Sequence, residues 1–268
     1  LSAQDEGAVA YNGPEVSDGE DPDEAAVLGN RDLKQGLYAL EGVDLFNLLC
    51  IPPLGRVDEG EDDLPDGLIT AALAYCEERR AFFIADSPRR WNTNVQALLG
   101  NPLAREQMPQ PLQDVSGRNG AVFFPRYLAP DPRRGGLFAR TDATRGVWKA
   151  PAGIEATIRA ASDLAVKLTD LQNGVLNPVA INCLRAFPGV GIVSWGARTL
   201  RGKDLLAEVD NKYIPVRSLT LFIAESLYRG TKFAVFEPND EPLWAQLRLA
   251  VESFLQGLFR QGAFQGRT

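Results

Sequence analysis

The first half of the chain alternates short, largely apolar runs with a segment of helical periodicity, and this pattern constrains the fold most. The apolar runs are Phe46–Ile51, Ala81–Ala85 and Ala121–Phe124, of which only the first contains a polar residue, Asn47. Such runs predict strands buried on both faces, as in a parallel sheet covered by helices. Between the first two runs, apolar residues recur at helical spacing from Leu68 to Cys76, and we expect Asp66 to cap this helix. The first half therefore predicts an α/β fold.

The second half has a different pattern, in which two β-rich runs precede two amphipathic helices. The runs Val179–Phe187 and Gly191–Trp195 flank a short turn that contains Pro and Gly, and they predict a hairpin. Apolar spacing then predicts one helix over Leu219–Leu227 and another over Leu243–Leu258. Between these helices, Lys232–Phe236 predicts a strand. This half is typical of an α+β arrangement.

Charge is unevenly distributed along the chain. The formal net charge is −7, and residues 1–32 alone carry nine acidic groups and one arginine. We interpret residues 1–36 as an acidic leader or solvated loop. The rest of the chain carries 26 acidic and 27 basic groups, and this near-neutral balance does not favour binding to nucleic acid. Because no run of apolar residues is long enough to span a bilayer, we also expect no membrane insertion.

The absence of histidine excludes His-based catalytic triads and imidazole metal sites. Cys50, Cys76 and Cys183 are too far apart for a zinc knuckle or a disulfide framework, so we expect buried thiols in a reducing compartment. The acidic run Asp58–Asp66 lacks the register of a calcium loop and predicts a solvated loop. Ser194 lacks the first glycine of a nucleophile elbow. We therefore predict no catalytic residue, no metal and no cofactor.

A basic segment lies in the middle of the chain. From Arg118 to Lys149 there are seven basic and two acidic residues. The overlapping stretch Arg126–Gly153 is rich in Pro and Gly and predicts an irregular surface loop. The segment is either a structural loop or a patch that docks an acidic partner surface. Trp148 lies within it and is a candidate interface anchor, with core packing as the alternative.

Several motifs in the chain resemble those of contractile tail sheath proteins. In order, they are Val43–Pro53, Thr141–Gly153, Leu176–Asn182, Gly191–Leu200, Tyr213–Arg217 and Phe236–Asp240, followed by the pair Leu243-Trp244. The similarity extends from about residue 37 to residue 264. Because many motifs occur in the right order, the resemblance is far more specific than one isolated pattern would be.

The resemblance implies a particular architecture. It implies a subtilisin-like, parallel-sheet middle domain of α/β class over residues 37–150, without protease chemistry. It also implies a C-terminal α+β domain over residues 151–268, close to an inner tube. Members of the family normally have a segment before this region and a β-containing arm after the last helix, and these arms pair with neighbouring subunits. We expect the terminal arm to be missing from this chain.

The resemblance also implies a function. Members of the family surround a rigid tube in phage tails, R-type bacteriocins and extracellular contractile injection systems. We expect a non-enzymatic subunit that polymerises helically around the tube and contracts to drive it through a target envelope. Expected partners are further copies, the inner tube protein, and baseplate and tail terminator proteins. Assembly is expected in the bacterial cytoplasm, and the product in a virion tail or an injection particle.

Two alternatives to a sheath subunit stay open from the sequence. One is a baseplate or tail-terminator component of the same machine, and the other is a small-molecule hydrolase built on an α/β sheet. For the sheath interpretation, two sets of residues are predicted to face partners. The set predicted to contact neighbouring copies is Arg140, Arg145, Trp148 and Lys149. The set predicted to face the inner tube, on the last helix, is Arg248, Glu252 and Arg260.

Overall fold

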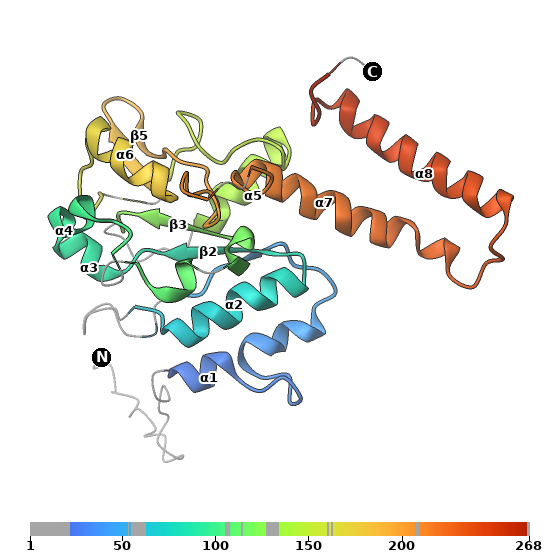
Figure 1. Cartoon of the computed structure of the whole chain (residues 1–268), viewed down its shortest axis with the longest axis horizontal. Coiled ribbons are helices and arrows are strands. Elements are labelled where there is room, and N and C mark those ends of the chain that lie inside the picture. Colours follow the sequence, from blue (N-terminus) through green and yellow to red (C-terminus); the bar gives the residue numbers. More distant parts are fainter. Residues whose placement is uncertain are drawn as a thin grey trace, which may run out of the picture.

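A five-stranded sheet lies at the centre of the molecule (Figure 1). The computed structural model describes residues 22–52, 54, 63–104, 108–113, 115–126, 134–159, 161, 163–206 and 209–266. In their order across the sheet, the strands are β1 (Leu48–Leu49), β2 (Phe82–Asp86), β3 (Gly120–Phe124), β4 (Ile181–Phe187) and β5 (Gly191–Ser194). The first four pair in parallel and the last two antiparallel. The predicted α/β class and the predicted β4–β5 hairpin are therefore confirmed.

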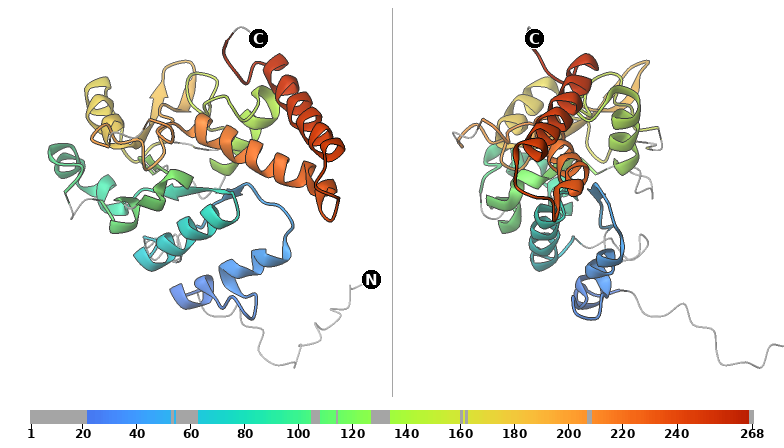
Figure 2. Two further views of the ribbon diagram at one scale, coloured as in Figure 1. Left: turned by 45° about the vertical axis from the view of Figure 1, so that its right-hand side comes forward. Right: turned by 90° about the vertical axis from the view of Figure 1, so that its right-hand side faces the viewer.

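Helices surround this sheet and extend to one side of it (Figures 1 and 2). The α-helices are α1 (Glu24–Leu28), α2 (Asp66–Glu78), α3 (Arg89–Thr93), α4 (Val95–Gly100), α5 (Arg134–Arg145), α6 (Asp170–Leu176), α7 (Ile214–Gly230) and α8 (Glu241–Arg260). Short 3₁₀ helices are η1 (Gly36–Gly42), η2 (Gln110–Gln113), η3 (Val115–Asn119), η4 (Asn177–Val179) and η5 (Lys232–Ala234). Among the described helices, none combines the length and apolar character that a membrane crossing requires.

The core has two layers because alternate residues of each central strand point to opposite faces of the sheet. On one face, Phe83 and Val122 pack with residues of α2 such as Leu73. On the other face, Phe82 and Phe123 pack with α5 and α7. Both central strands are therefore buried on both sides, which explains why their sequences are apolar at every position. Burial of each such phenylalanine contributes about 1.5–3 kcal/mol.

Helices α7 and α8 form a hairpin that projects from the sheet (Figure 2). The first half of α7 is anchored, because Ile214 and Leu221 are buried in the core. The only buried residue of α8 is Leu258. The two helices contact one another through the rings of Phe222 and Phe254, whose centroids are 6.1 Å apart. Most of this hairpin therefore lies outside the core, although both helices agree with the predicted apolar spacing.

Two predictions of irregular structure are wrong in part. The stretch Arg126–Gly153 contains α5, because Leu137 and Phe138 bury against the sheet and stabilise a helix close to the glycines and prolines. In the acidic leader, the Asp23 carboxylate accepts a hydrogen bond of 2.7 Å from a backbone amide of α1 and caps that helix. Residues 1–21 of the leader lie outside the described residues.

Smaller predictions also fail, each for a local reason. Lys232–Phe236 is not a strand, since its first residues form η5 and no described strand lies beside it. Asp66 is the first residue of α2, and Pro65 takes the cap position; the Asp66 charge still favours this helix end. Cys50 is exposed, whereas Cys76 and Cys183 are buried as expected. Residues 58–62 of the second acidic run lie outside the described residues.

Candidate functional site

The motif Thr141–Gly153 covers the end of α5 and the turn that follows it. Gly146 has a φ angle of +87°, and a Cβ atom at this position would lie 2.5 Å from the ring of Trp148. A side chain would therefore meet both backbone strain and a steric clash, and glycine avoids both. The half-buried Trp148 thus packs against the turn of its own motif.

Beyond this turn, the chain runs along the outer edge of β5. The amide of Gly153 donates to Ser194 O at 2.9 Å, Ser194 N donates to Ala156 O at 3.0 Å, and Ile158 N donates to Ile192 O at 2.8 Å. An unpaired strand edge is a template for association with another chain. Along these residues, the edge of β5 is already occupied by the protein itself.

The four residues predicted to contact neighbouring copies lie close together in the sequence but differ in surroundings. Arg145 is exposed and forms an ion pair of 2.6 Å with Glu155. Arg140 is half-buried and donates to Thr157 O at 2.6 Å. Lys149 is half-buried and its ammonium group lies 3.4 Å from Ala150 O. Arg140 therefore helps to hold the β5 edge segment, while Arg145 presents its charge at the surface.

Asp142 of the same motif has an unusual environment for a carboxyl group. Burial raises its pKa to about 6, since the charged form loses part of its hydration. The half-buried carboxyl group lies on α5, three residues before Arg145. The pKa of this carboxyl group therefore lies closer to neutral pH than that of an ordinary aspartate.

Two further motifs of the resemblance meet through a buried asparagine. Asn182, on β4, is completely buried, and its side-chain amide donates to Val122 O at 3.1 Å and to Arg198 O at 2.7 Å. Its carbonyl oxygen accepts from Arg198 N at 2.7 Å. The Asn182 side chain therefore links the β3–β4 pair to the loop after β5. Both motifs are visible in the sequence, but their spacing does not predict this contact.

The Arg198 side chain extends the same network. Its guanidinium group donates to Asn177 Oδ1 at 2.8 Å and forms an ion pair of 2.6 Å with Asp204. Asp204 also pairs with Lys212 at 2.6 Å. Hydrogen bonds from both cations lower the pKa of Asp204 to about 2. This loop is therefore held by charge-assisted hydrogen bonds and not by apolar packing alone.

The motif Tyr213–Arg217 attaches the root of α7 to the sheet. Ile214 is buried, and Arg217 Nε donates to Asn119 Oδ1 at 2.8 Å. The buried Asn119 amide in turn donates to Cys76 O and Ala81 O, at the end of α2 and the start of β2. A single chain of hydrogen bonds thus connects α7 with the other side of the sheet.

At the far end of the hairpin, apolar side chains are exposed. Phe236 is fully exposed at 102% and has a φ angle of +68°, a rare conformation for a bulky residue. Trp244 is 44% exposed and donates from its ring nitrogen to Asn239 at 2.7 Å. Phe233 and Val235, in the same connection between α7 and α8, are also exposed, at 43% and 58%.

The residues predicted to face the inner tube all lie on α8. Arg248 is exposed and pairs with Glu241 at 2.7 Å. Glu252 and Arg260 are also exposed. The structure gives these side chains solvent-facing positions, and which surface they contact stays a prediction.

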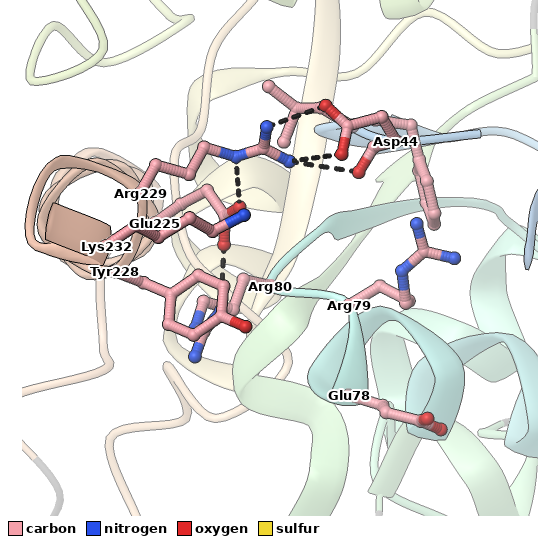
Figure 3. Close-up of a pocket in the computed structure, with 10 residues that line it drawn as sticks. Asp44, Glu78, Arg79, Arg80, Glu225, Tyr228, Arg229 and Lys232 are labelled. Carbon is pink, nitrogen blue, oxygen red and sulfur yellow. Dashed lines mark hydrogen bonds and ion pairs between the residues drawn. The ribbon is translucent and has the colours of Figure 1, made fainter. Parts of the chain in front are cut away.

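A polar cleft of about 230 Å³ lies between the second half of α7 and the segment that leads into β1 (Figure 3). Arg229 forms ion pairs with Asp44 at 2.7 Å and with Glu225 at 2.6 Å. Glu225 also pairs with Arg80 at 2.8 Å, and the Arg80 guanidinium lies 4.9 Å from the centre of the Tyr228 ring. The partners Arg229 and Asp44 are 185 residues apart, and no spacing in the sequence predicted their contact.

The arrangement of these groups offers little for catalysis. Burial raises the pKa values of the Cys76 and Cys183 thiols to about 12, so neither is a ready nucleophile. Within the described ranges, no group of three or more acidic or cysteine side chains could hold a metal ion. The cleft is smaller than typical small-molecule sites, which occupy about 300–1,000 Å³.

Comparison with known proteins identifies relatives in contractile machines. No protein-family model matches the chain. The tail sheath protein of Vibrio phage KVP40 (isolate Vibrio parahaemolyticus/Japan/Matsuzaki/1991) is 27% identical over 124 residues, which are 46% of this chain and 18% of that protein.

Solved structures match over more of the chain. A chain in the cryo-EM structure of the anti-feeding prophage (AFP) baseplate matches 93% of this chain and 61% of its own length, with 28% identity and a TM-score of 0.68. A chain in the contracted PVC sheath complex, an extracellular contractile injection system, matches 85% of this chain and 59% of its own, with 28% identity and a TM-score of 0.62.

This chain therefore spans less than two thirds of the length of each of these relatives. The relatives are structural components and not enzymes, in agreement with the prediction of a non-enzymatic protein. In both sequence and fold, the chain is similar to the contractile tail sheath family, and the resemblance drawn from its motifs is confirmed.

Proposed function

We propose that this chain is part of a structural subunit of a contractile sheath, which polymerises helically around an inner tube and contracts to drive it through a target envelope. The observation that carries this proposal is the match to the contracted PVC sheath complex over 85% of the chain, at 28% identity. The sequence match to a phage tail sheath protein supports the same assignment.

The proposed mechanism needs no chemical reaction. Identical subunits that contact one another head to tail form an open helix. If the extended helix is metastable, a trigger at the baseplate allows subunits to rotate as rigid bodies into better contacts. Burial of ~400 Å² more apolar surface per subunit would release on the order of 10 kcal/mol, as an upper bound before entropy costs. The exposed apolar residues at the end of the α7–α8 hairpin supply surface of this kind.

We assign contacts between copies to the surface around Arg145, together with Arg140, Trp148 and Lys149. Arg145 supports this assignment best, because its charge is exposed and its ion pair with Glu155 is open to solvent and exchangeable. Arg140 and Trp148 act in this scheme by holding the turn in shape, since both are engaged within the chain.

We assign the tube-facing surface to the polar side of α8, with Arg248, Glu252 and Arg260. These side chains are exposed and carry both signs of charge, which suits a polar contact that must hold and release. The other proposed partners are baseplate and tail terminator proteins. Assembly in the bacterial cytoplasm, followed by release in a phage tail or injection particle, follows from the same assignment.

We further propose that the parallel strands follow a subtilisin-like topology and that residues 37–150 and 151–268 are the middle and C-terminal domains of the sheath subunit. The parallel β1–β2–β3 arrangement with α2 between β1 and β2 is compatible with this topology. The two proposed domains share one sheet, because β4 and β5 continue the sheet that β1–β3 begin.

A second candidate is a baseplate component of the same kind of machine. The match to a chain of the AFP baseplate structure, with a TM-score of 0.68 over 93% of this chain, favours it. Both candidates are structural and use the same fold, so they differ in whether many copies polymerise along the tube.

Electron microscopy of the full-length gene product tests the proposal. A sheath subunit should form hollow, striated cylinders when expressed with or without its tube protein, whereas a baseplate component should form none. A second experiment tests the interface assignment. The double variant Arg145→Glu, Lys149→Glu should reduce the number of cylinders that form. The matched control is Lys167→Glu, since Lys167 is exposed and outside the proposed surface. Unchanged assembly by the double variant would remove the interface assignment, and nucleotide hydrolysis by contracting particles would contradict the mechanism.

A further inference from the structure

The α7–α8 hairpin is held against the rest of the molecule in two different ways along its length. The buried residues of α7, Ile214 and Leu221, both lie in its first half. In the second half, Phe222 and Tyr228 are exposed at 38% and 56%. Ion pairs reach from this half to the body of the protein, as Figure 3 shows, together with the contact of the Arg80 guanidinium with the Tyr228 ring.

These ion pairs form one connected series. Arg80, two residues after the end of α2, pairs with Glu225, and Glu225 pairs with Arg229. Arg229 in turn donates to both carboxylate oxygens of Asp44 and to its backbone oxygen. This series of ion pairs therefore joins α7 to two separate parts of the body, the segment after α2 and the segment before β1. A bidentate arginine contact fixes orientation as well as distance.

The same groups lie beside open space. The cleft of about 230 Å³ is bounded by Asp44, Arg80, Glu225 and Arg229, so these side chains can separate without colliding with packed neighbours. The side chains at the two ends of this series of ion pairs are exposed, Asp44 at 84% and Arg80 at 39%, and those of Arg229 and Glu225 in the middle are 33% and 17% exposed. Ion pairs in such surroundings are weak and are screened by salt.

We propose that Arg80, Glu225, Arg229 and Asp44 form an ionic latch, and that opening it allows the α7–α8 hairpin to change its angle to the sheet about the anchored root of α7. An apolar interface would resist such a motion, because sliding would expose surface to water. An ionic contact exchanges protein partners for water and ions at small cost. The root stays in place, since Arg217 is bonded to the buried Asn119.

The inference goes beyond the proposed function and is tested on the unassembled chain, so its outcome does not depend on polymerisation. Spin labels are placed at Ala74→Cys on α2 and Ser253→Cys on α8, both exposed positions, in a Cys50→Ser background that removes the exposed native thiol. Pulsed electron–electron double resonance then gives the distribution of distances between the label on the body and the label on the hairpin.

A narrow distribution is expected at low salt with the native latch. In 1 M NaCl, and in Arg229→Gln or Asp44→Asn at low salt, the distribution should broaden roughly twofold. Amides of α8 should also exchange hydrogen roughly two- to fivefold faster in these variants. The double variant should add little to Arg229→Gln alone, since that change already removes the contact with Asp44. The matched control is Arg145→Gln, which removes an exposed ion pair of 2.6 Å elsewhere and should leave the distribution unchanged.

Identical distributions in the native protein and in both latch variants, at low and high salt, would overturn the inference. If Arg229→Gln lost its fold by circular dichroism, Asp44→Asn would still decide the question, because its side chain is almost fully in solvent. Equal broadening in the Arg145→Gln control would also count against the latch, since it would indicate general loosening of the chain.

Discussion

The sheet and the α7–α8 hairpin are stabilised by different physical means. In the sheet, residues such as Phe83 and Val122 are completely buried between two layers of side chains. In the hairpin, α8 buries only Leu258, and Phe236 at the connection is fully exposed. The sheet is therefore stable within one chain, whereas the hairpin has apolar surface left to cover. This difference indicates that the sheet is the scaffold and that the hairpin is the part available for contact.

The largest expected effect is on the free energy of unfolding when a phenylalanine side chain is removed from each region. Phe83→Ala should lower the free energy of unfolding by about 3–5 kcal/mol, because it removes a large side chain from a packed core. Phe236→Ala removes the same side chain from the hairpin and should change stability by less than about 0.5 kcal/mol. Guanidinium unfolding followed by circular dichroism measures both. Equal losses would mean that the hairpin is as much part of the core as the sheet is.

The next effect concerns polar groups inside the body. Asn182→Leu should cost about 2–4 kcal/mol, because Val122 O and Arg198 N lose partners in a buried site. Asn239→Ala, which removes one exposed hydrogen bond to Trp244 in the hairpin, should cost at most about 1 kcal/mol. The same unfolding assay applies. A small loss for Asn182→Leu would show that the loop after β5 is held by something other than this side chain.

Glycine substitutions should differ in sign between the two regions. Gly146→Ala should destabilise by about 1–3 kcal/mol, since it adds a methyl group at positive φ and against Trp148. Gly257→Ala, in the interior of α8 with open space around it, should stabilise by up to about 1 kcal/mol. Thermal unfolding of the two variants compares them directly. Stabilisation by Gly146→Ala would contradict the packing described for the turn.

The smallest effect is a pH dependence of opposite sign in the two regions. The pKa of Asp142 is raised to about 6 from an unfolded value near 3.9, so the folded state binds its proton more tightly. Its contribution is present below about pH 4 and is lost as the pH rises through 6. Asp142→Asn should therefore add on the order of 1 kcal/mol at pH 8, after allowance for solvent screening, and little at pH 4.

In the latch the direction is reversed. Hydrogen bonds from Arg229 lower the pKa values of Asp44 and Glu225, so their contribution is present above the unfolded pKa and is lost as the pH falls through the folded one. At pH 8, Asp142→Asn should therefore be more stable than the native protein and Asp44→Asn less stable, and both differences should shrink as the pH falls. Parallel profiles would show that one of the two carboxyl environments is different from the one described.

Local features of the fold could be predicted from sequence because they depend on neighbours along the chain. The strand β2 follows from the unbroken apolar run Ala81–Ala85, and α8 follows from its apolar spacing and from Asp240, which accepts a hydrogen bond from Leu243 N. The helix α5 was missed because glycines and prolines near it outweighed the two residues that bury, Leu137 and Phe138. Burial against a distant surface is not visible in a local pattern.

Contacts between distant residues could not be predicted in the same way. The motifs that contain Asn182 and Arg198 were recognised by resemblance, but their hydrogen bonds depend on how β4 and the following loop meet. The signal that existed was a polar Asn within an apolar strand, which must find partners when buried. For Arg229 and Asp44, separated by 185 residues, ordinary surface charges gave no signal at all. The interface residues Arg145 and Lys149 stay predictions, because a single chain does not contain the surface they would contact.

The continuity of α7 has a geometric consequence. This helix of 17 residues begins in the core and ends outside it without a break. At 1.5 Å per residue it acts as a rod of roughly 25 Å, so a rotation of roughly 10° at Ile214 would carry its far end by roughly 4 Å. A small rotation at the packed end of α7 therefore moves its exposed end by roughly the diameter of one atom.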